Sequence, residues 1–503
     1  MQSTSPIILS TLNARYMHTA FGLRYIYANL GALQDQTKIL EFTIQELPIN
    51  IVEQILALQP KIIGLSVYIW NVSEIHKVVA MLKQISPELI VVLGGPEVSH
   101  YPDVPEVAVL ADYVISGPGE ASLRELCQQL LNGERPEQKF IEGTATPLNE
   151  LLLPYDYYDD DDIRNRLIYV EASRGCPFKC EFCLSALDKT VSPFPLDAFF
   201  AEMDKLLQRG VRNFKFIDRT FNLKISTSVA ILEFFLARMT DDLYLHFEVV
   251  PDNLPDKLKE MLRRFPANSL QFEIGVQTFD PEIQDLISRK QNNEKTKDNL
   301  TWLRENTGAH LHTDLIFGLP SDTLENFGDS FDQLLALNPH EIQMGILKRL
   351  RGAPLNRHNE PYLLRFNPEP PYNILTTLDI TFSEMQRVNR FARFWDMLGN
   401  SGRFSHSLPL ILTDQPFKHF MKLSDSLYLR AGSSWKIALK RLFELVYVIL
   451  TEDFKLSPDV VKQQLAIDYA RAKIKGIPDY ERDRPVEKTV RVGVANKRQL
   501  AHQ

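Results

Sequence analysis

The chain has 503 residues, of which 44% are hydrophobic and 24% charged, and its formal net charge is -8. This length predicts roughly two to four domains, because a single hydrophobic core stops growing at about 250–300 residues. The acidic balance excludes the broad basic surface typical of nucleic-acid binding, so nucleic acid is not an expected partner.

The first 140 residues alternate short apolar runs with helical patterns such as Phe21–Leu33 and Ser73–Gln84. The runs are rich in Ile, Val and Leu with little alternation, which is typical of strands buried on both faces. This predicts an α/β domain with a doubly wound parallel sheet, whose ligand would bind beyond the carboxyl ends of the strands. The expected strands are 7–12, 38–42, 61–68, 89–95 and 112–117.

Residues 141–166 are interpreted as a linker that contains an acidic run, Tyr155–Asp162, expected to be a solvated surface segment. Residues 167–370 show a second alternating series, which predicts a partial (β/α) barrel with its site at the carboxyl ends of the strands. The six expected barrel strands are 167–173, 213–218, 243–250, 270–277, 310–318 and 341–347.

From 371 to 481 the pattern is mainly helical, with the clearest helices at Ser434–Thr451 and Pro458–Lys473. Trp435, Phe443 and Tyr447 are predicted to lie on the first of these helices as a core-packing stripe. The last residues, 482–503, are polar and expected to form a loose tail.

Four cysteines in so long a chain exclude a disulfide framework and indicate a reducing compartment. The start, MQSTSPIILS, lacks the basic and apolar segments of a signal peptide. The apolar run Leu442–Leu450 falls far short of the ~20 residues that span a bilayer. We therefore expect a cytoplasmic protein without a membrane span.

Three of the four cysteines lie within eight positions, in the stretch EASRGCPFKCEFCLSA. Cys176, Cys180 and Cys183 directly follow the first expected barrel strand, where barrel chemistry occurs. A [4Fe–4S] cluster is normally held by four thiolates, so three would leave one iron open, as a catalytic site does. The alternative is a zinc knuckle, but zinc would need a fourth ligand. The remaining cysteine, Cys127, is interpreted as a buried apolar residue on the helix Ser122–Leu131.

The CxxxCxxC motif with Phe182 before its last cysteine resembles the radical S-adenosylmethionine (SAM) superfamily. The resemblance implies that SAM chelates the open iron and is cleaved to a 5′-deoxyadenosyl radical. Stretches such as FIDRTFN, FEIGVQTFD and DLIFGLPSDT are similar to later strand ends of that family. It further implies contacts to the methionine, ribose or adenine of SAM by Asp218, Glu248, Glu273, Gln277 and Gly318.

The N-terminal domain resembles the cobalamin-binding domain that often precedes such barrels. The resemblance rests on NARYMHTAFG, LGGPEVS and ISGPGE, and on small residues at strand ends that would let a corrin or its tail approach the backbone. These are Ser66, Gly94, Gly95 and Gly117. The chain departs from the Asp-x-His-x-x-Gly motif, since no Asp precedes His18 and the glycine is one residue late, so His18 is not expected to ligate cobalt.

The whole domain order is similar to cobalamin-dependent radical SAM proteins that end in a DUF4080 domain, with LNARYMHTAFGLRYI as one of the closest matches. This implies a [4Fe–4S] cluster, SAM and cobalamin as cofactors, and a reducing partner such as flavodoxin or ferredoxin. The implied reaction is methyl transfer to a poorly activated carbon of a small-molecule or peptide substrate. Alternatives are a radical ring rearrangement or cyclisation with the same cofactors, and a non-catalytic iron–sulfur electron carrier or regulator.

Overall fold

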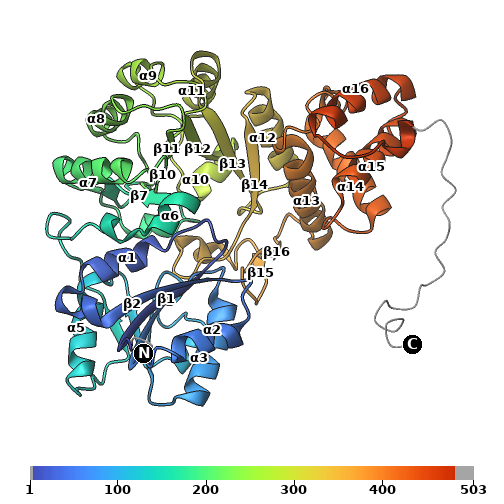
Figure 1. Ribbon diagram of the computed structural model, residues 1–503. Coiled ribbons are helices and arrows are strands. Elements are labelled where there is room, and N and C mark those ends of the chain that lie inside the picture. Colours follow the sequence, from blue (N-terminus) through green and yellow to red (C-terminus); the bar gives the residue numbers. More distant parts are fainter. Residues whose placement is uncertain (1–3, 482–503) are drawn as a thin grey trace, which may run out of the picture. The chain divides into compact units, whose positions relative to one another are not determined.

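The computed structural model describes residues 4–481, which belong to two compact units, Met1–Met385 and Gln386–Gln503. The first unit contains two parallel six-stranded sheets, each with helices between its strands (Figure 1). The described part of the second unit is helical. The predicted α/β fold class, with its doubly wound sheet, partial barrel and helical C-terminal region, is confirmed.

The N-terminal sheet has the strand order β2-β1-β3-β4-β5-β6, and every neighbouring pair is parallel. Its strands are β1 (Ile7–Asn13), β2 (Thr37–Thr43), β3 (Ile62–Ser66), β4 (Ile90–Gly94), β5 (Tyr113–Ser116) and β6 (Phe140–Glu142). Its helices are α1 (Phe21–Ala28), α2 (Pro48–Leu56), α3 (Val72–Ile85), α4 (Val107–Leu110) and α5 (Glu120–Leu131), with the 3-10 helix η1 (Gly31–Gln36). The expected strands are all present, whereas β6 lies at the start of the segment interpreted as a linker.

The apolar runs form strands here because both faces of the sheet are covered. Ile8 of β1 packs in the core on one face, while its neighbours Ile7 and Leu9 pack in the core on the other. Successive side chains of a strand point to opposite faces, so a strand between two cores must be apolar throughout. The helix expected at Phe21–Leu33 is shorter, because α1 ends at Ala28 and Gly31, with φ of +57°, begins η1.

The second sheet has the order β14-β13-β12-β11-β10-β7, so β7 and β14 are edge strands and the barrel is partial. Its strands are β7 (Ile168–Val170), β10 (Asn213–Phe216), β11 (Tyr244–Val249), β12 (Leu270–Gln277), β13 (His310–Phe317) and β14 (Glu341–Ile346). Its helices are α7 (Leu196–Gln208), α8 (Ile225–Leu236), α9 (Asp256–Leu262), α10 (Pro281–Leu286), α11 (Asn293–Asn306) and α12 (Leu324–Ala336). In β12 and β13 fully buried residues alternate with partly exposed ones, so one face of the sheet is apolar and the other carries polar side chains.

Short elements connect these sheets and extend the barrel. They are η2 (Tyr155–Tyr157), α6 (Asp160–Asn165), the hairpin of β8 (Ser173–Arg174) and β9 (Ser192–Pro193), η3 (Leu184–Leu187), η4 (Pro354–His358), and the pair β15 (Arg365–Phe366) and β16 (Ile374–Thr376).

The acidic segment 155–162 is only in part the solvated surface that its composition predicts. Tyr155 and Tyr158 are each 1% exposed, and Asp162 is 2% exposed. Asp162 pairs with Arg24 of α1 and with Arg166, at 2.5 and 2.8 Å. The two tyrosines supply apolar area and the arginines supply counter-charge, so these three residues are buried, while Asp156, Tyr157 and Asp159–Asp161 of the same segment are exposed as expected.

The second unit is built on helices whose aromatic residues pack together. They are α13 (Phe382–Trp395), which begins in the first unit, the π-helical turn η5 (Asp396–Asn400), η6 (Leu408–Leu410), α14 (Pro416–Ala431), α15 (Leu439–Glu452), α16 (Pro458–Arg471) and η7 (Asp479–Glu481). Phe443 stacks on Phe404 at 4.2 Å between ring centres.

The predicted aromatic stripe is wrong for Trp435, which precedes α15 and is 65% exposed, because Ala438 rather than Ser434 caps the helix. Within residues 4–481 we find no helix with the length and apolarity that crossing a membrane requires. The predicted loose tail at 482–503 lies outside the described residues.

Candidate functional site

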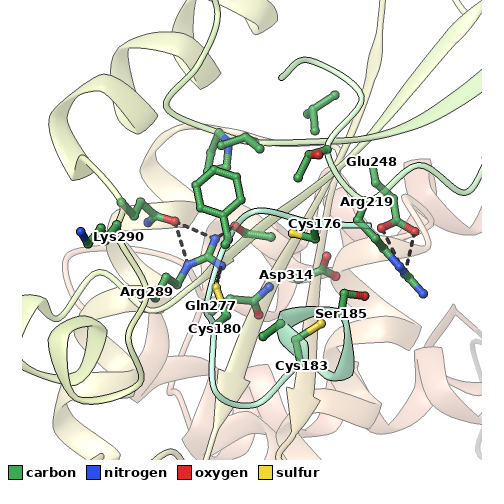
Figure 2. Close-up of a pocket in the computed structure, with 18 of the residues that line it drawn as sticks. Cys176, Cys180, Cys183, Ser185, Arg219, Glu248, Gln277, Arg289, Lys290 and Asp314 are labelled. Atoms are coloured by element: carbon green, nitrogen blue, oxygen red, sulfur yellow. Dashed lines mark hydrogen bonds and ion pairs between the residues drawn. The ribbon is translucent and has the colours of Figure 1, made fainter. Parts of the chain in front are cut away.

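The cysteine motif lines a cavity of about 280 Å³ at the carboxyl ends of the barrel strands (Figure 2). Cys176, Cys180 and Cys183 all border this cavity, and each is a free thiol of intermediate exposure. Phe182 borders it as well. The remaining cysteine, Cys127, is fully buried in α5 as predicted.

The chain entering this loop is fixed by a glycine and an aspartate. Gly175 has φ of +95°, and a Cβ at this position would collide with the carbonyl oxygen of Thr190. The carboxylate of Asp218 accepts hydrogen bonds from the backbone N–H of Ala172, at 3.0 Å, and from the hydroxyl of Ser173, at 2.6 Å. Burial raises the pKa of Asp218 to about 7, against the effect of these hydrogen bonds. Asp218 therefore fixes the start of the loop through these hydrogen bonds and does not line the cavity.

Glu181 holds the middle of the loop. Its carboxylate accepts hydrogen bonds from Arg357 at 2.8 Å and from Ser288 at 2.6 Å, and His358 Nε2 lies 3.0 Å away. Burial alone would raise the pKa of Glu181, but the bonds from Arg357 and Ser288 lower it to about 2. The carboxylate is therefore ionised at neutral pH.

A guanidinium lies against one of the cysteine sulfurs. Arg289, in the loop after α10, places Nη1 3.5 Å from Cys180 Sγ and donates from Nη2 to the carbonyl oxygen of Gly275. Burial raises the pKa of the Cys180 thiol, and Arg289 opposes this effect. Lys290 borders the same cavity, so two adjacent cations lie beside the cysteines.

Gln277 is strained and has an unpaired buried oxygen. The register between β12 and β13 shifts between Gly275 and Gln277, and Gln277 has φ of +69°, where non-glycine residues are uncommon. Its amide lies over Gly275, where a side chain would collide with it. Its Oε1 is buried without a hydrogen-bond partner among the described residues. Buried polar atoms are normally satisfied, so this oxygen indicates that a donor from a ligand completes the site.

Carboxylates also line the cavity. Glu248 pairs with Arg219 at 3.3 Å, and burial raises its pKa while Arg219 opposes the shift. Glu273 pairs with Lys215 at 3.1 Å and with His246 at 3.0 Å. The bond with His246 is the largest effect on Glu273, whose pKa falls to about 2.

A second cavity, of about 260 Å³, lies at the carboxyl ends of the N-terminal strands. The predicted residues that line it are Ser66, Gly94, Gly95 and Gly117. Gly117 has φ of +80°, and a Cβ added there would meet no atom of the described residues within 4 Å, so its side faces open space. Gly95, with φ of +101°, is crowded instead, because a Cβ there would lie 2.6 Å from the backbone of Val67. Both positions need the backbone freedom of glycine, but only Gly117 leaves room for a ligand.

A third cavity, of about 550 Å³, lies between the N-terminal sheet and the barrel. His18 borders it and places Nδ1 2.6 Å from the hydroxyl of Tyr169. Tyr68 and Trp70 stack at 4.3 Å between ring centres and line it as well. Arg174 borders both this cavity and the second one, and it is only two residues from Cys176.

The structure brings most of the predicted site residues together. The predicted residues that line the first cavity are Cys176, Cys180, Phe182, Cys183, Glu248, Glu273 and Gln277. Gly318 lies outside it, where a Cβ would meet Ile374 at 2.8 Å and Met385 at 3.2 Å. Sequence reasoning missed Arg219 and Arg289, although Arg219 directly follows Asp218 and Arg289 precedes a second cation.

Within residues 4–481, no group of three His, Cys, Asp or Glu side chains is placed to hold a single metal ion. A cubane makes a different demand, because its four irons are spread over a cluster that several thiolates surround. The donor set fits such a group: three thiols border one cavity, whose lining also holds cations and an unsatisfied amide oxygen.

Comparison with known families assigns all three regions of the chain. The family described as "B12 binding domain" matches residues 9–127, and the Radical SAM superfamily matches residues 170–334. "Protein of unknown function (DUF4080)" matches residues 360–500. The chain therefore combines a B12-binding domain, a radical SAM domain and a DUF4080 domain. The predicted cofactors of this radical SAM protein, a [4Fe–4S] cluster, SAM and cobalamin, are thereby confirmed.

Individual relatives agree with this assignment. The chain is similar to the cobalamin-dependent radical SAM methyltransferase TokK of Streptomyces tokunonensis, at 27% identity over 65% of this chain and 52% of TokK. It is also similar to 2-(S-pantetheinyl)-carbapenam-3-carboxylate methyltransferase of Streptantibioticus cattleyicolor, at 25% identity over 59% of this chain and 48% of the relative. The chain thus spans about half the length of these curated relatives.

The fold is similar to a solved structure of the radical SAM methyltransferase TsrM from Kitasatospora setae, with cobalamin and a [4Fe–4S] cluster bound. The TM-score is 0.56 at 18% identity, over 70% of this chain and 77% of TsrM. At this identity the likeness concerns the fold alone.

Proposed function

We propose that the protein is a methyltransferase that acts on a poorly activated carbon of a small molecule or peptide. The observation that carries the proposal is the connection between two sites. Arg174 lines the cavity of the B12-binding domain, and two residues later Cys176 lines the cavity of the radical SAM domain. A reaction that uses both cofactors on one substrate needs such proximity.

In this proposal Cys176, Cys180 and Cys183 hold the cluster, and the cavity beside them takes SAM. When bound, the cluster supplies one electron to cleave SAM, and cobalamin supplies a carrier for the methyl group. Arg289 would pair with the carboxylate of the methionine part, because a guanidinium matches a carboxylate in geometry and charge. Gln277 and Glu273 would accept hydrogen bonds from the ribose hydroxyls.

The N-terminal cavity would hold cobalamin, with Gly117 leaving room for it against the backbone. His18 would not take part in holding it, because His18 borders the third cavity and not the N-terminal one. A reduced flavodoxin or ferredoxin would deliver the electron. The substrate would bind in the third cavity, between the two cofactor domains, where Tyr68 and Trp70 present aromatic surface.

The test begins with anaerobic reconstitution of the full chain with iron, sulfide and hydroxocobalamin. The protein is then incubated with SAM and a chemical reductant, and S-adenosylhomocysteine and 5′-deoxyadenosine are measured by mass spectrometry. We expect both products from the wild type and no 5′-deoxyadenosine from Cys180→Ala. A cluster-loaded protein that forms neither product would be an electron carrier or regulator, which would refute the proposal.

Methyl transfer and rearrangement are separated with SAM that carries a trideuterated methyl group. The reconstituted protein is incubated with a small-molecule extract, and new masses are compared with those from the Cys180→Ala variant. A product that gains one labelled methyl group supports methyl transfer. A new product without the label, formed with 5′-deoxyadenosine, would instead establish a rearrangement or cyclisation.

A further inference from the structure

Glu181, the residue that follows the second cysteine of the motif, is held by hydrogen bonds to distant parts of the chain. Glu181 is 5% exposed although it is a glutamate in a loop. Its backbone N–H donates to the carbonyl oxygen of Ile287 at 3.0 Å, and its own carbonyl oxygen accepts from the N–H of Leu355 at 2.9 Å. The loop is therefore joined by backbone bonds to two segments that are more than a hundred residues away in sequence.

The carboxylate of Glu181 adds side-chain bonds to the same two segments. Arg357 of η4 approaches with Nε and Nη2, both at 2.8 Å, which is the two-pronged geometry of a strong guanidinium–carboxylate pair. Ser288, which follows α10, donates from its hydroxyl at 2.6 Å. Ser288 has φ of +55°, so the backbone accepts a sparsely populated conformation where it meets Glu181.

We propose that Glu181 is a positioning residue, which fixes Cys180 and Cys183 relative to the rest of the barrel. Glu181 is the next residue after Cys180 and lies two before Cys183, and consecutive Cα atoms are held about 3.8 Å apart by the planar peptide bond. A carboxylate fixed by Arg357 therefore limits how far either sulfur can move. Outer-sphere partners of this kind orient metal ligands and set how tightly the metal is held.

The pair of Glu181 and Arg357 mainly fixes the orientation of the Glu181 carboxylate. The side chain of Arg357 is 62% exposed, and exposed pairs contribute little to the free energy of unfolding. Its two parallel bonds nevertheless define the direction of the carboxylate. His358, which is 4% exposed, contacts the carboxylate from the buried side. We therefore expect substitution of Glu181 to affect the cluster more than the global stability.

The inference rests on the proposed function in that it assumes a cluster on the three thiolates. Glu181→Gln keeps the shape of the side chain but removes the charge that pairs with Arg357. Arg357→Gln removes the other partner at an exposed position and is expected to fold even where a change of Glu181 is not tolerated. Glu360→Gln is the matched control, because Glu360 is 82% exposed and pairs with the half-exposed Arg365 at 3.2 Å.

Each anaerobically reconstituted variant is mixed with an iron chelator, and iron release is followed by absorbance. We expect release from Glu181→Gln and from Arg357→Gln to be about tenfold faster than from the wild type. The double variant should release iron no faster than Glu181→Gln alone, because the charge pair that Arg357→Gln removes is already lost with the carboxylate of Glu181. The electron paramagnetic resonance spectrum of the reduced cluster should broaden in both variants, while Glu360→Gln matches the wild type.

The proposal is overturned if Glu181→Gln keeps the wild-type release rate and spectrum, or if the effects of the two substitutions add. It is equally overturned if only the melting temperature falls, since that would be a structural role. Hydrogen exchange of peptides covering 176–186 in the cluster-free protein gives an independent measurement. If the wild type itself holds no iron, the proposed function fails, and faster exchange in Glu181→Gln still decides whether Glu181 orders the loop.

Discussion

Substitution of Arg351 by methionine should destabilise the contact between the B12-binding domain and the barrel in a pH-dependent way. Arg351 follows β14 and pairs with Glu97, which follows β4, at 2.9 Å. The two side chains are 11% and 4% exposed. Arg351 also lies over the ring of Tyr372 at 5.2 Å. Burial raises the pKa of Glu97, and Arg351 is among the groups that oppose this rise. Without Arg351, the carboxylate would be buried without its main counter-charge.

The cost of Arg351→Met is limited by protonation of Glu97. At pH 7 the carboxyl lies 2.5 pH units above its ordinary pKa of 4.5, and one pH unit corresponds to about 1.4 kcal/mol. Neutralising it therefore costs about 3.4 kcal/mol at pH 7 and about 0.7 kcal/mol at pH 5. The folded pKa is raised above the unfolded one, so stability is lost as pH rises from 4.5. The pKa of Glu97 is already raised with Arg351 in place, so the wild type carries part of this cost, and we expect losses of at most about 3 kcal/mol at pH 7 and under about 1 kcal/mol at pH 5.

Native-state hydrogen exchange measures this loss locally, which matters because a chain of two compact units does not unfold in one step. Peptides covering 95–104 and 348–358 should lose protection at pH 7, by up to about a hundredfold. Arg365→Met is the control, since its partner is exposed and its loss should cost less than about 1 kcal/mol. Glu97→Gln combined with Arg351→Met should recover most of the protection. An equal loss at both pH values, or a loss at pH 7 below about 0.5 kcal/mol, would refute the reasoning.

Three further outcomes follow from the geometry. Gly95→Ala should cost about 2 kcal/mol, measured by hydrogen exchange of peptides covering 90–98, because of its left-handed backbone and crowded Cβ position. Gly117→Ala should cost about 1 kcal/mol but lower the hydroxocobalamin retained after gel filtration. Burial lowers the pKa of His312, but bonds to two carboxylates raise it to about 10, so its contribution to stability is full below pH 6.5 and is lost as pH rises toward 10. In native-state hydrogen exchange of peptides covering 310–317, the wild type should lose about 1–2 kcal/mol more than His312→Gln between pH 6.5 and 9, after allowance for solvent screening. Arg219→Met should lower 5′-deoxyadenosine formation about tenfold without lowering iron content, and a matching loss of iron would contradict its place beside SAM.

The strands could be predicted from the sequence because burial on both faces leaves a local signature. Ile7, Ile8 and Leu9 are apolar whichever face they point to, so the run itself marks the strand. The cysteine motif was equally local. Its position after a barrel strand places the thiols at the end of the sheet where parallel (β/α) folds carry their sites.

The contacts that complete the site are not local, and this is why the sequence did not reveal them. Glu181 pairs with Ser288 and Arg357, which lie 107 and 176 residues further along the chain. For Asp162 the sequence suggested an exposed position, whereas the residue is buried. Its neighbours are mostly acidic, so the segment resembles a solvated surface, but its counter-charge comes from Arg24, 138 residues earlier. Composition within a segment cannot report a partner outside it.

An incomplete barrel raises the question of what fixes its open side. The strands at its two edges, β7 and β14, are not joined by backbone hydrogen bonds in the described sheet. The cysteine loop follows β7, and the segment that contains Arg351 and Arg357 follows β14. This segment binds Glu181 of the loop through Arg357, and it binds Glu97 of the B12-binding domain through Arg351. One stretch of chain thus joins the two ends of the open sheet to the neighbouring domain. The open side can remain accessible to a substrate while both cofactor sites keep their places, because side-chain and loop contacts replace the missing pairing of the edge strands.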